Sequence, residues 1–150
     1  MECTVTWTGA AGAKSAMSFM AETGSGHIVH MDGAPNPDQP GLSGGNLAAR
    51  PMELLLVGAG GCSSFDVVMI LKRGRHDIRG CQVKVTGDRA DVDPKVYTTI
   101  HMHYVVTGKG LPQAAVERAV QLSHEKFCSA TIMLAKTANI THSLEVIEAA

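Results

Sequence analysis

Aromatic and charged residues are both scarce in this sequence, and their scarcity excludes two classes of partner. The 150 residues include only three Phe, two Tyr and one Trp, and charged residues make up 18%. Positive and negative side chains nearly balance, at a net charge of −1. Without a basic patch interleaved with aromatic residues, there is no electrostatic case for binding nucleic acid or an anionic membrane.

Cysteine is also scarce, and its spacing excludes a disulfide framework. The four cysteines form no C-x-x-C pair, and the first residues, MECTVTW, lack the basic start and apolar run of a signal peptide. We therefore expect a cytoplasmic protein whose cysteines are thiols at rest. The sequence also contains no GxGxxG, P-loop, HExxH or Ser-His-Asp signature, and we expect no cofactor.

The longest apolar run, from Arg50 to Arg73, predicts the central helix of the fold. Pro51 suits a first helical turn, and Gly74 follows two basic residues that suit the last turn. Apolar side chains cover nearly every face, so we expect the helix to be buried all round. The run is about long enough to cross a membrane. Because it holds Asp66, two serines and three glycines, a buried core helix is the better interpretation.

Periodicity on both sides of this helix predicts a single domain over residues 1–150 of the α+β class, in the order βββ-α-ββ-αα-β. A flexible turn at Gly9–Lys14 and a loop at Gly33–Asn46 separate the early elements. The central helix is too apolar for one sheet face to cover, so a homodimer is expected to supply the second cover. The predicted strands are 2–8, Ser15–Glu22, His27–Asp32, Ile78–Asp88, Tyr97–Thr107 and Ile140–Ile147, and the further helices are Leu111–Glu125 and Ala130–Ala138.

Two cysteines are placed where they could react. Cys62 follows a glycine pair in the central helix, and Cys128 precedes an apolar helix with Ser129 as its N-cap, where the helix N-terminus lowers a thiol pKa. If the two meet, one could attack a peroxide and the other could resolve the sulfenic acid to a disulfide. The other interpretation is that both are small buried apolar side chains, as free cysteines usually are. Cys3 and Cys81 lie in predicted strands and are interpreted as structural.

Two carboxylates and three histidines could act together with these cysteines. Glu53 lies in the first helical turn, where a negative charge interacts favourably with the helix dipole. It could also hold a basic residue near the thiol. Asp66 lies one turn after Cys62 on the same face, where its charge would raise the thiol pKa. His101, His103 and His124 could join the cysteines in a zinc site, but the spacing matches no standard ligand pattern, so no metal is expected.

These motifs resemble those of the OsmC/Ohr family. The resemblance is carried by Pro51-Met52-Glu53-Leu54-Leu55-Leu56 with Ala59-Gly60-Gly61-Cys62, and by Phe127-Cys128-Ser129. The runs Ile70-Leu71-Lys72-Arg73-Gly74-Arg75 and Asn139-Ile140-Thr141-His142-Ser143 look like its YhfA-like branch.

The resemblance implies an intertwined α+β homodimer with two active sites at the subunit interface. It implies a thiol-dependent peroxidase in which Cys62 attacks an organic hydroperoxide, Cys128 resolves, and an external dithiol reduces the disulfide. Glu53 resembles a glutamate that, in the better-studied branches, pairs with an arginine from the N-terminal strands. No arginine precedes Arg50 here, and Lys14 is the nearest cationic candidate.

Three hypotheses follow for the function. The first is this cysteine peroxidase. The second is a dimeric protein of the same fold that binds a small apolar or thiol-reactive ligand, or that senses redox state through its cysteines. A Cys/His metal site is the third.

Overall fold

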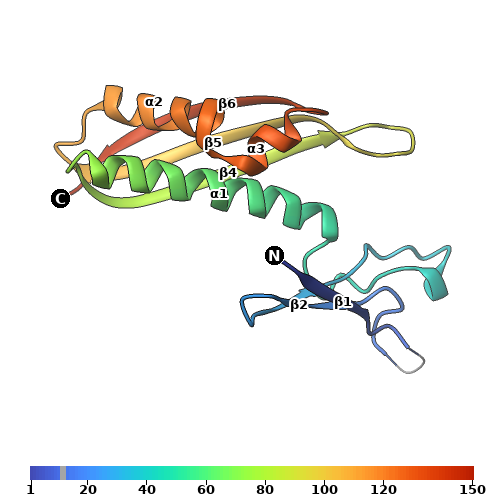
Figure 1. The fold of residues 1–150 in the computed structure, drawn as a ribbon. Helices are drawn as coiled ribbons and strands as arrows, with labels where there is room; N and C mark the ends of the chain where they lie inside the picture. Colours follow the sequence, from blue (N-terminus) through green and yellow to red (C-terminus); the bar gives the residue numbers. More distant parts are fainter. Residues whose placement is uncertain (11–12) are drawn as a thin grey trace. The chain divides into compact units, whose positions relative to one another are not determined.

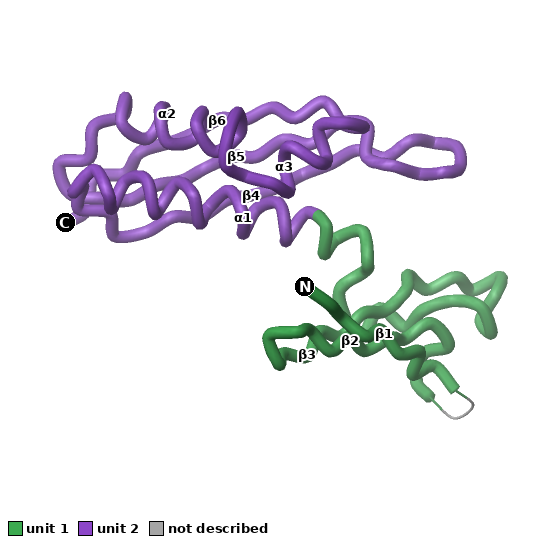
Figure 2. The backbone as a smooth tube through the Cα atoms, viewed as in Figure 1, with its two compact units in different colours: residues 1–55 green, residues 56–150 purple. Residues whose placement is uncertain are grey.

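The computed structural model describes residues 1–10 and 13–150. They divide into two compact units, residues 1–55 and residues 56–150 (Figure 2). The observed element order, three strands, a long helix, two strands, two helices and a final strand, confirms the predicted α+β order. The single domain predicted for residues 1–150 stays a prediction.

The first unit contains an antiparallel sheet in the order β1-β2-β3 (Figure 1). Its strands are β1 (Cys3–Trp7), β2 (Phe19–Thr23) and β3 (Ile28–Met31). The second strand begins later than the predicted Ser15, at Phe19, which pairs with Trp7 of β1, and the Ser15 hydroxyl donates a hydrogen bond to Asp32 instead. The turn predicted at Gly9–Lys14 includes residues 11–12, which lie outside the described residues.

A buried carboxylate, Asp32, organises the loop that follows β3. It is 1% exposed and accepts hydrogen bonds from the Ser15 hydroxyl and from the backbone N–H groups of Gly33, Gly45 and Leu47. Burial raises the pKa of Asp32, but the four hydrogen bonds together lower it by more than burial raises it. The pKa therefore lies below its ordinary value. Asp32 therefore ties both ends of the predicted loop together, and a short 3₁₀ turn (Pro40–Leu42) lies within that loop.

The long helix α1 (Pro51–Arg73) has the predicted bounds but not the predicted burial. Within the chain, α1 buries one stripe and leaves large apolar side chains exposed, among them Leu55, Val57 and Phe65. Burial all round is therefore not seen within one chain, and cover of the exposed face by a homodimer stays a prediction. By length and composition α1 could also cross a membrane, a test that core helices of soluble proteins pass as well. The buried stripe consists of Ala59, Gly60, Ser63, Asp66, Val67 and Leu71.

One glycine of α1 is explained by close packing. A Cβ added to Gly60 would lie 3.0 Å from Cγ2 of Val85 on the neighbouring strand, whereas Gly58 and Gly61 face open space. Among these three glycines, a close approach to the neighbouring strand is thus made at Gly60 alone, and by a side chain. It lets α1 lie close to the sheet just where the cysteine follows.

The second unit is a three-stranded sheet in the order β4-β5-β6, with α1, α2 and α3 along one face (Figure 1). β4 (Asp77–Arg89) pairs antiparallel with β5 (Tyr97–Lys109), and β6 (Asn139–Glu148) pairs parallel with β5. Alternate residues of β5 point into the core, in agreement with the period of two expected for a strand covered on one face. The core side chains here include Ile100, Met102, Tyr104, Val106, Val116 and Val120.

The predicted helix Leu111–Glu125 is shorter and ends in a different way. It comprises α2 (Gln113–Leu122) and a π-helical turn (Ser123–Phe127), and α3 (Ser129–Leu134) follows after one residue. That residue is Cys128, whose N–H donates to the Ser123 carbonyl at 2.8 Å. The wider turn therefore sets Cys128 against α1.

Candidate thiol site

The structure brings three of the predicted residues together. The two sulfur atoms of Cys62 and Cys128 and a carboxylate oxygen of Asp66 all lie within 4.8 Å of one another. Cys62 is partly exposed, Cys128 is fully buried and Asp66 is 8% exposed. We call these three residues the thiol site. Its members come from the middle of α1 and from the residue before α3, so the fold places two thiols side by side although 66 residues separate them in the chain.

Cys128 is held at the start of α3, but its thiol is not acidified there. Cys128 itself, and not Ser129 as predicted, is the N-cap, and its sulfur accepts the N–H of Thr131 at 3.5 Å. Burial raises the pKa of the Cys128 thiol, neighbouring Cys62 raises it further, and the hydrogen bonds to Thr131 lower it only in part. The lowering predicted at the helix N-terminus is present, through Thr131, but burial outweighs it, so the pKa of Cys128 is raised overall and Cys128 remains a thiol at neutral pH.

The hydrogen bonds and ion pairs of Asp66 account only in part for the burial of its carboxylate. Its carboxylate accepts a hydrogen bond from the Ser123 hydroxyl at 3.1 Å. No lysine or arginine of residues 56–150 forms an ion pair with it; the ion pair in that part of the chain joins Arg79 to Asp77. A buried carboxylate is costly unless a cation or several hydrogen bonds offset its charge.

A chain of hydrogen bonds leads from Asp66 toward the surface. Ser123 contacts Ser63 at 2.9 Å, Ser63 contacts the Tyr104 hydroxyl, and that hydroxyl contacts Nε2 of His124 at 2.9 Å. Each hydroxyl has one proton to donate. Because Ser123 donates to Asp66, Ser63 donates to Ser123, Tyr104 donates to Ser63, and His124 donates to Tyr104. All the donors thus point toward the carboxylate.

His124 lies at the outer end of this chain and is held neutral. Burial, with a smaller contribution from His142, lowers the pKa of His124 to about 4. The His142 ring stacks on it at 4.7 Å between centroids, and burial, with a contribution from His101, lowers the pKa of His142 as well. Burial raises the pKa of the Tyr104 hydroxyl. His124, His142 and Tyr104 are therefore neutral at physiological pH.

The Cys/His cluster considered as an alternative does not form among the described residues. His101 binds the hydroxyls of Thr141 and Ser143, and His103 also binds Ser143. The group of His, Cys, Asp or Glu side chains close enough to hold a metal, in the part of the chain that the structure describes, is the thiol site, which contains no histidine.

The two remaining candidates, Glu53 and Lys14, belong to residues 1–55. The Glu53 carboxylate accepts the backbone N–H of Arg50 at 2.9 Å, which caps the start of α1. Among residues 1–10 and 13–55 it makes no ion pair with a lysine or arginine. Lys14 is exposed. No cation therefore pairs with Glu53 among the described residues of this unit.

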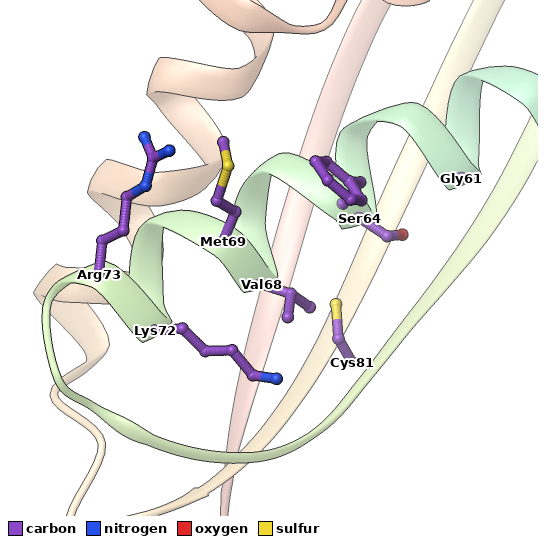
Figure 3. Close-up of a pocket in the computed structure, with 8 residues that line it drawn as sticks. Gly61, Ser64, Val68, Met69, Lys72, Arg73 and Cys81 are labelled. Carbon is purple, nitrogen blue, oxygen red and sulfur yellow. The ribbon is translucent and has the colours of Figure 1, made fainter.

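A groove of about 680 Å³ runs along the exposed side of α1 (Figure 3). Apolar side chains form its walls, and Lys72 and Arg73 lie at one end. Cys81 lies at its floor on β4, where burial raises the pKa of the thiol, in agreement with a structural role. The lining residues are Gly61, Ser64, Phe65, Val68, Met69, Lys72, Arg73 and Cys81.

Sequence reasoning missed the polar chain behind the thiol site. Ser63 and Asp66 are three residues apart on a run that is otherwise mostly apolar, and Ser123 closes the apolar stripe of α2. Polar residues on the buried stripe of a helix need partners. That is the one signal in the sequence that could have pointed to the chain, although it could not have named Tyr104.

The fold and the paired thiols define a class of α+β proteins with two cysteines at the centre. Similarity to known proteins identifies this class. Residues 44–143 match the family model of OsmC-like protein. YhfA of Escherichia coli K12 is 47% identical over 133 residues, which cover 89% of this chain and 92% of YhfA. The chain belongs to the OsmC-like family.

Solved structures agree with this assignment. A hypothetical protein from Aquifex aeolicus is 30% identical with a TM-score of 0.79, over 99% of this chain and 97% of that one. An organic hydroperoxide resistance protein OsmC from Legionella pneumophila has a TM-score of 0.66 at 17% identity, over 97% and 98% of the two chains. At that identity the likeness shows the fold alone.

Proposed function

We propose that this protein is a cysteine-based peroxidase that reduces organic hydroperoxides. The observation that supports the proposal is the thiol site, in which Cys62 is partly exposed and Cys128 is buried within 4.8 Å of it. An accessible thiol can meet a substrate, and a buried thiol beside it is protected until it is needed. The family supports the same function, since the Legionella relative of the same fold is named for organic hydroperoxide resistance.

The proposed reaction has two steps at the thiol site. The Cys62 sulfur attacks the terminal peroxide oxygen, the O–O bond breaks, and the thiol proton ends on the alcohol that leaves, so that RSH and R′OOH give RSOH and R′OH. The Cys128 thiol then attacks the Cys62 sulfenic acid, and water leaves as the disulfide forms. An external dithiol reduces the disulfide and returns both thiols.

The polar chain has a part in this proposal. It joins the carboxylate beside the two thiols to the His124–His142 pair through Ser123, Ser63 and Tyr104. Such a chain can pass a proton inward by successive transfers, because each hydroxyl both accepts and donates. We assign to it the exchange of protons between the buried site and the solvent.

A homodimer is part of the proposal. Phe65, Val57 and Leu55 of α1 are exposed in the single chain, as are Val5 and Trp7 of β1. In the described part of residues 1–55, the buried apolar side chain is Ala21 alone, and a unit with so small a core needs further cover. Sedimentation equilibrium should give twice the chain mass of 15.8 kDa. The monomer mass at micromolar concentration would contradict the dimer.

The peroxidase is tested by oxidising the fully reduced protein in the presence of a chelator. One equivalent of cumene hydroperoxide should remove two hydrogens within seconds, and a disulfide map should show a Cys62–Cys128 link. Hydrogen peroxide at the same concentration should react more slowly. Slow oxidation spread over all four cysteines would show that the reaction is absent.

A second candidate function is a binding protein or redox sensor of the same fold. It is favoured by Glu53, which caps a helix and holds no arginine among the described residues of its unit, and by the raised pKa of Cys128. The same oxidation experiment separates the two. A sensor would form the disulfide slowly and would not turn over with excess dithiol.

A further inference from the structure

We propose that the reduced thiol site binds one zinc ion through Cys62, Cys128 and Asp66. The three ligand atoms already lie within 4.8 Å of one another, and they come from two elements of the same unit. The inference goes beyond the proposed peroxidase and does not rest on it, because metal binding needs the reduced thiols and the carboxylate but no peroxide.

The distances suit zinc after a small closure. Zinc–sulfur bonds of about 2.3 Å and tetrahedral angles place two ligand sulfurs about 3.8 Å apart. The present separations, at most 4.8 Å, need to shrink by about 1 Å or less. Rotation of the Cys62 and Asp66 side chains supplies such a change without moving the backbone. Cys62 is partly exposed, which gives the ion a way in.

Charge favours a cation at this place. Asp66 is buried and no cationic side chain of residues 56–150 pairs with it. Zinc brings two positive charges, and the two thiols each release a proton when they bind. The net charge of the site is therefore the same before and after binding, while the isolated carboxylate acquires a cationic neighbour.

The neighbours of the ligands are those of a supported metal site. Ser123 donates to one oxygen of Asp66, which fixes the carboxylate and leaves the other oxygen available. The Thr131 N–H donates to the Cys128 sulfur, which helps to stabilise a thiolate there. Ligands at zinc are usually held by such hydrogen bonds.

The donor set selects zinc over other common ions. Magnesium and calcium prefer oxygen ligands throughout, and copper(I) prefers sulfur throughout. Two thiolates and one carboxylate suit zinc, with the fourth position open to water. A zinc-bound site cannot form the Cys62–Cys128 disulfide, so the metal and oxidation would exclude each other.

The test is a zinc titration of reduced protein without peroxide, in competition with a chromophoric chelator. We expect one tightly bound ion per chain. The oxidised protein should retain only the weak binding of its seven histidines. Cys62→Ser and Cys128→Ser should each lower the affinity at least about 100-fold. Cys3→Ser, at an exposed cysteine outside the site, is the matched control and should bind as the parent protein does.

Asp66 is tested separately with cobalt as a spectroscopic probe. Asp66→Asn keeps an oxygen that can accept from Ser123, so the fold is retained, but it should weaken zinc about 10- to 100-fold. Cobalt in the reduced parent protein should give thiolate charge-transfer and tetrahedral bands, both absent in Cys62→Ser. Equal zinc binding by the reduced and oxidised forms, or an unchanged affinity in Asp66→Asn, would overturn the three-ligand site. Neither result would bear on hydroperoxide reduction, which is measured with chelator present.

Discussion

Replacing Cys62 with serine should lower the rate of organic hydroperoxide consumption at least about 1,000-fold. A serine hydroxyl is not ionised at neutral pH and is a far weaker nucleophile toward a peroxide than a thiolate. Cys62 is also the partly exposed thiol of the pair, whereas Cys128 is fully buried and cannot take over the attack. The measurement is the initial rate of cumene hydroperoxide loss with excess dithiol.

Cys128→Ser separates attack from resolution. This variant should consume one equivalent of hydroperoxide and then stop or slow, with a sulfenic acid on Cys62 that a dimedone probe traps. Cys3→Ser is the control, since Cys3 is exposed on β1, and it should turn over at the parent rate. If Cys62→Ser consumed hydroperoxide as fast as the parent protein, Cys62 would not be the attacking residue.

Removing the Asp32 carboxylate should cost about 3 kcal/mol of unfolding free energy. Asp32→Ala leaves the Ser15 hydroxyl and the N–H groups of Gly33 and Leu47 without their buried acceptor, while the Gly45 N–H keeps the Ser15 oxygen as a second acceptor. The measurement is urea unfolding, with hydrogen exchange of the Gly45 and Leu47 amides as a local readout. Asp38→Ala, at an exposed aspartate of the same loop, should change stability by less than about 0.5 kcal/mol.

The same carboxylate gives a dependence on pH with a definite sign. Its folded pKa is lowered, so its contribution is complete above the unfolded value of about 3.9 and is lost as the pH falls toward the folded value. The difference in unfolding free energy between the parent protein and Asp32→Ala should therefore become smaller in strong acid. A deficit that stayed constant from neutral pH to below the folded pKa would contradict the linkage.

The strong periodic segments could be predicted from the sequence, because their patterns are local. The bounds of α1 follow from a proline, a pair of basic residues and an unbroken apolar run. The burial of α1 could not be predicted for one chain, since composition shows which side chains avoid water but not which molecule covers them. Leu55, Val57 and Phe65, which avoid water by composition, are exposed in the single chain.

At the thiol site, too, one part could be predicted from the sequence and another could not. The family motifs pointed to Cys62 and Cys128, and the structure brings them together. The sequence could not show that the pKa of Cys128 is raised, because burial outweighs the local effect of a helix start. Nor could it show that Asp66 is joined to Tyr104 through two serines, because those residues come from α1, β5 and the π-helical turn.

The parallel pairing of β5 with β6 has a consequence for biosynthesis. Parallel neighbours cannot be joined by a tight hairpin, and here the chain between Lys109 and Asn139 makes the crossover that carries Cys128. A ribosome that has released α1 and the β4–β5 hairpin has therefore made Cys62 but not its partner. Until the crossover is made as far as residue 128, Cys62 is a thiol without its partner on an unfinished chain.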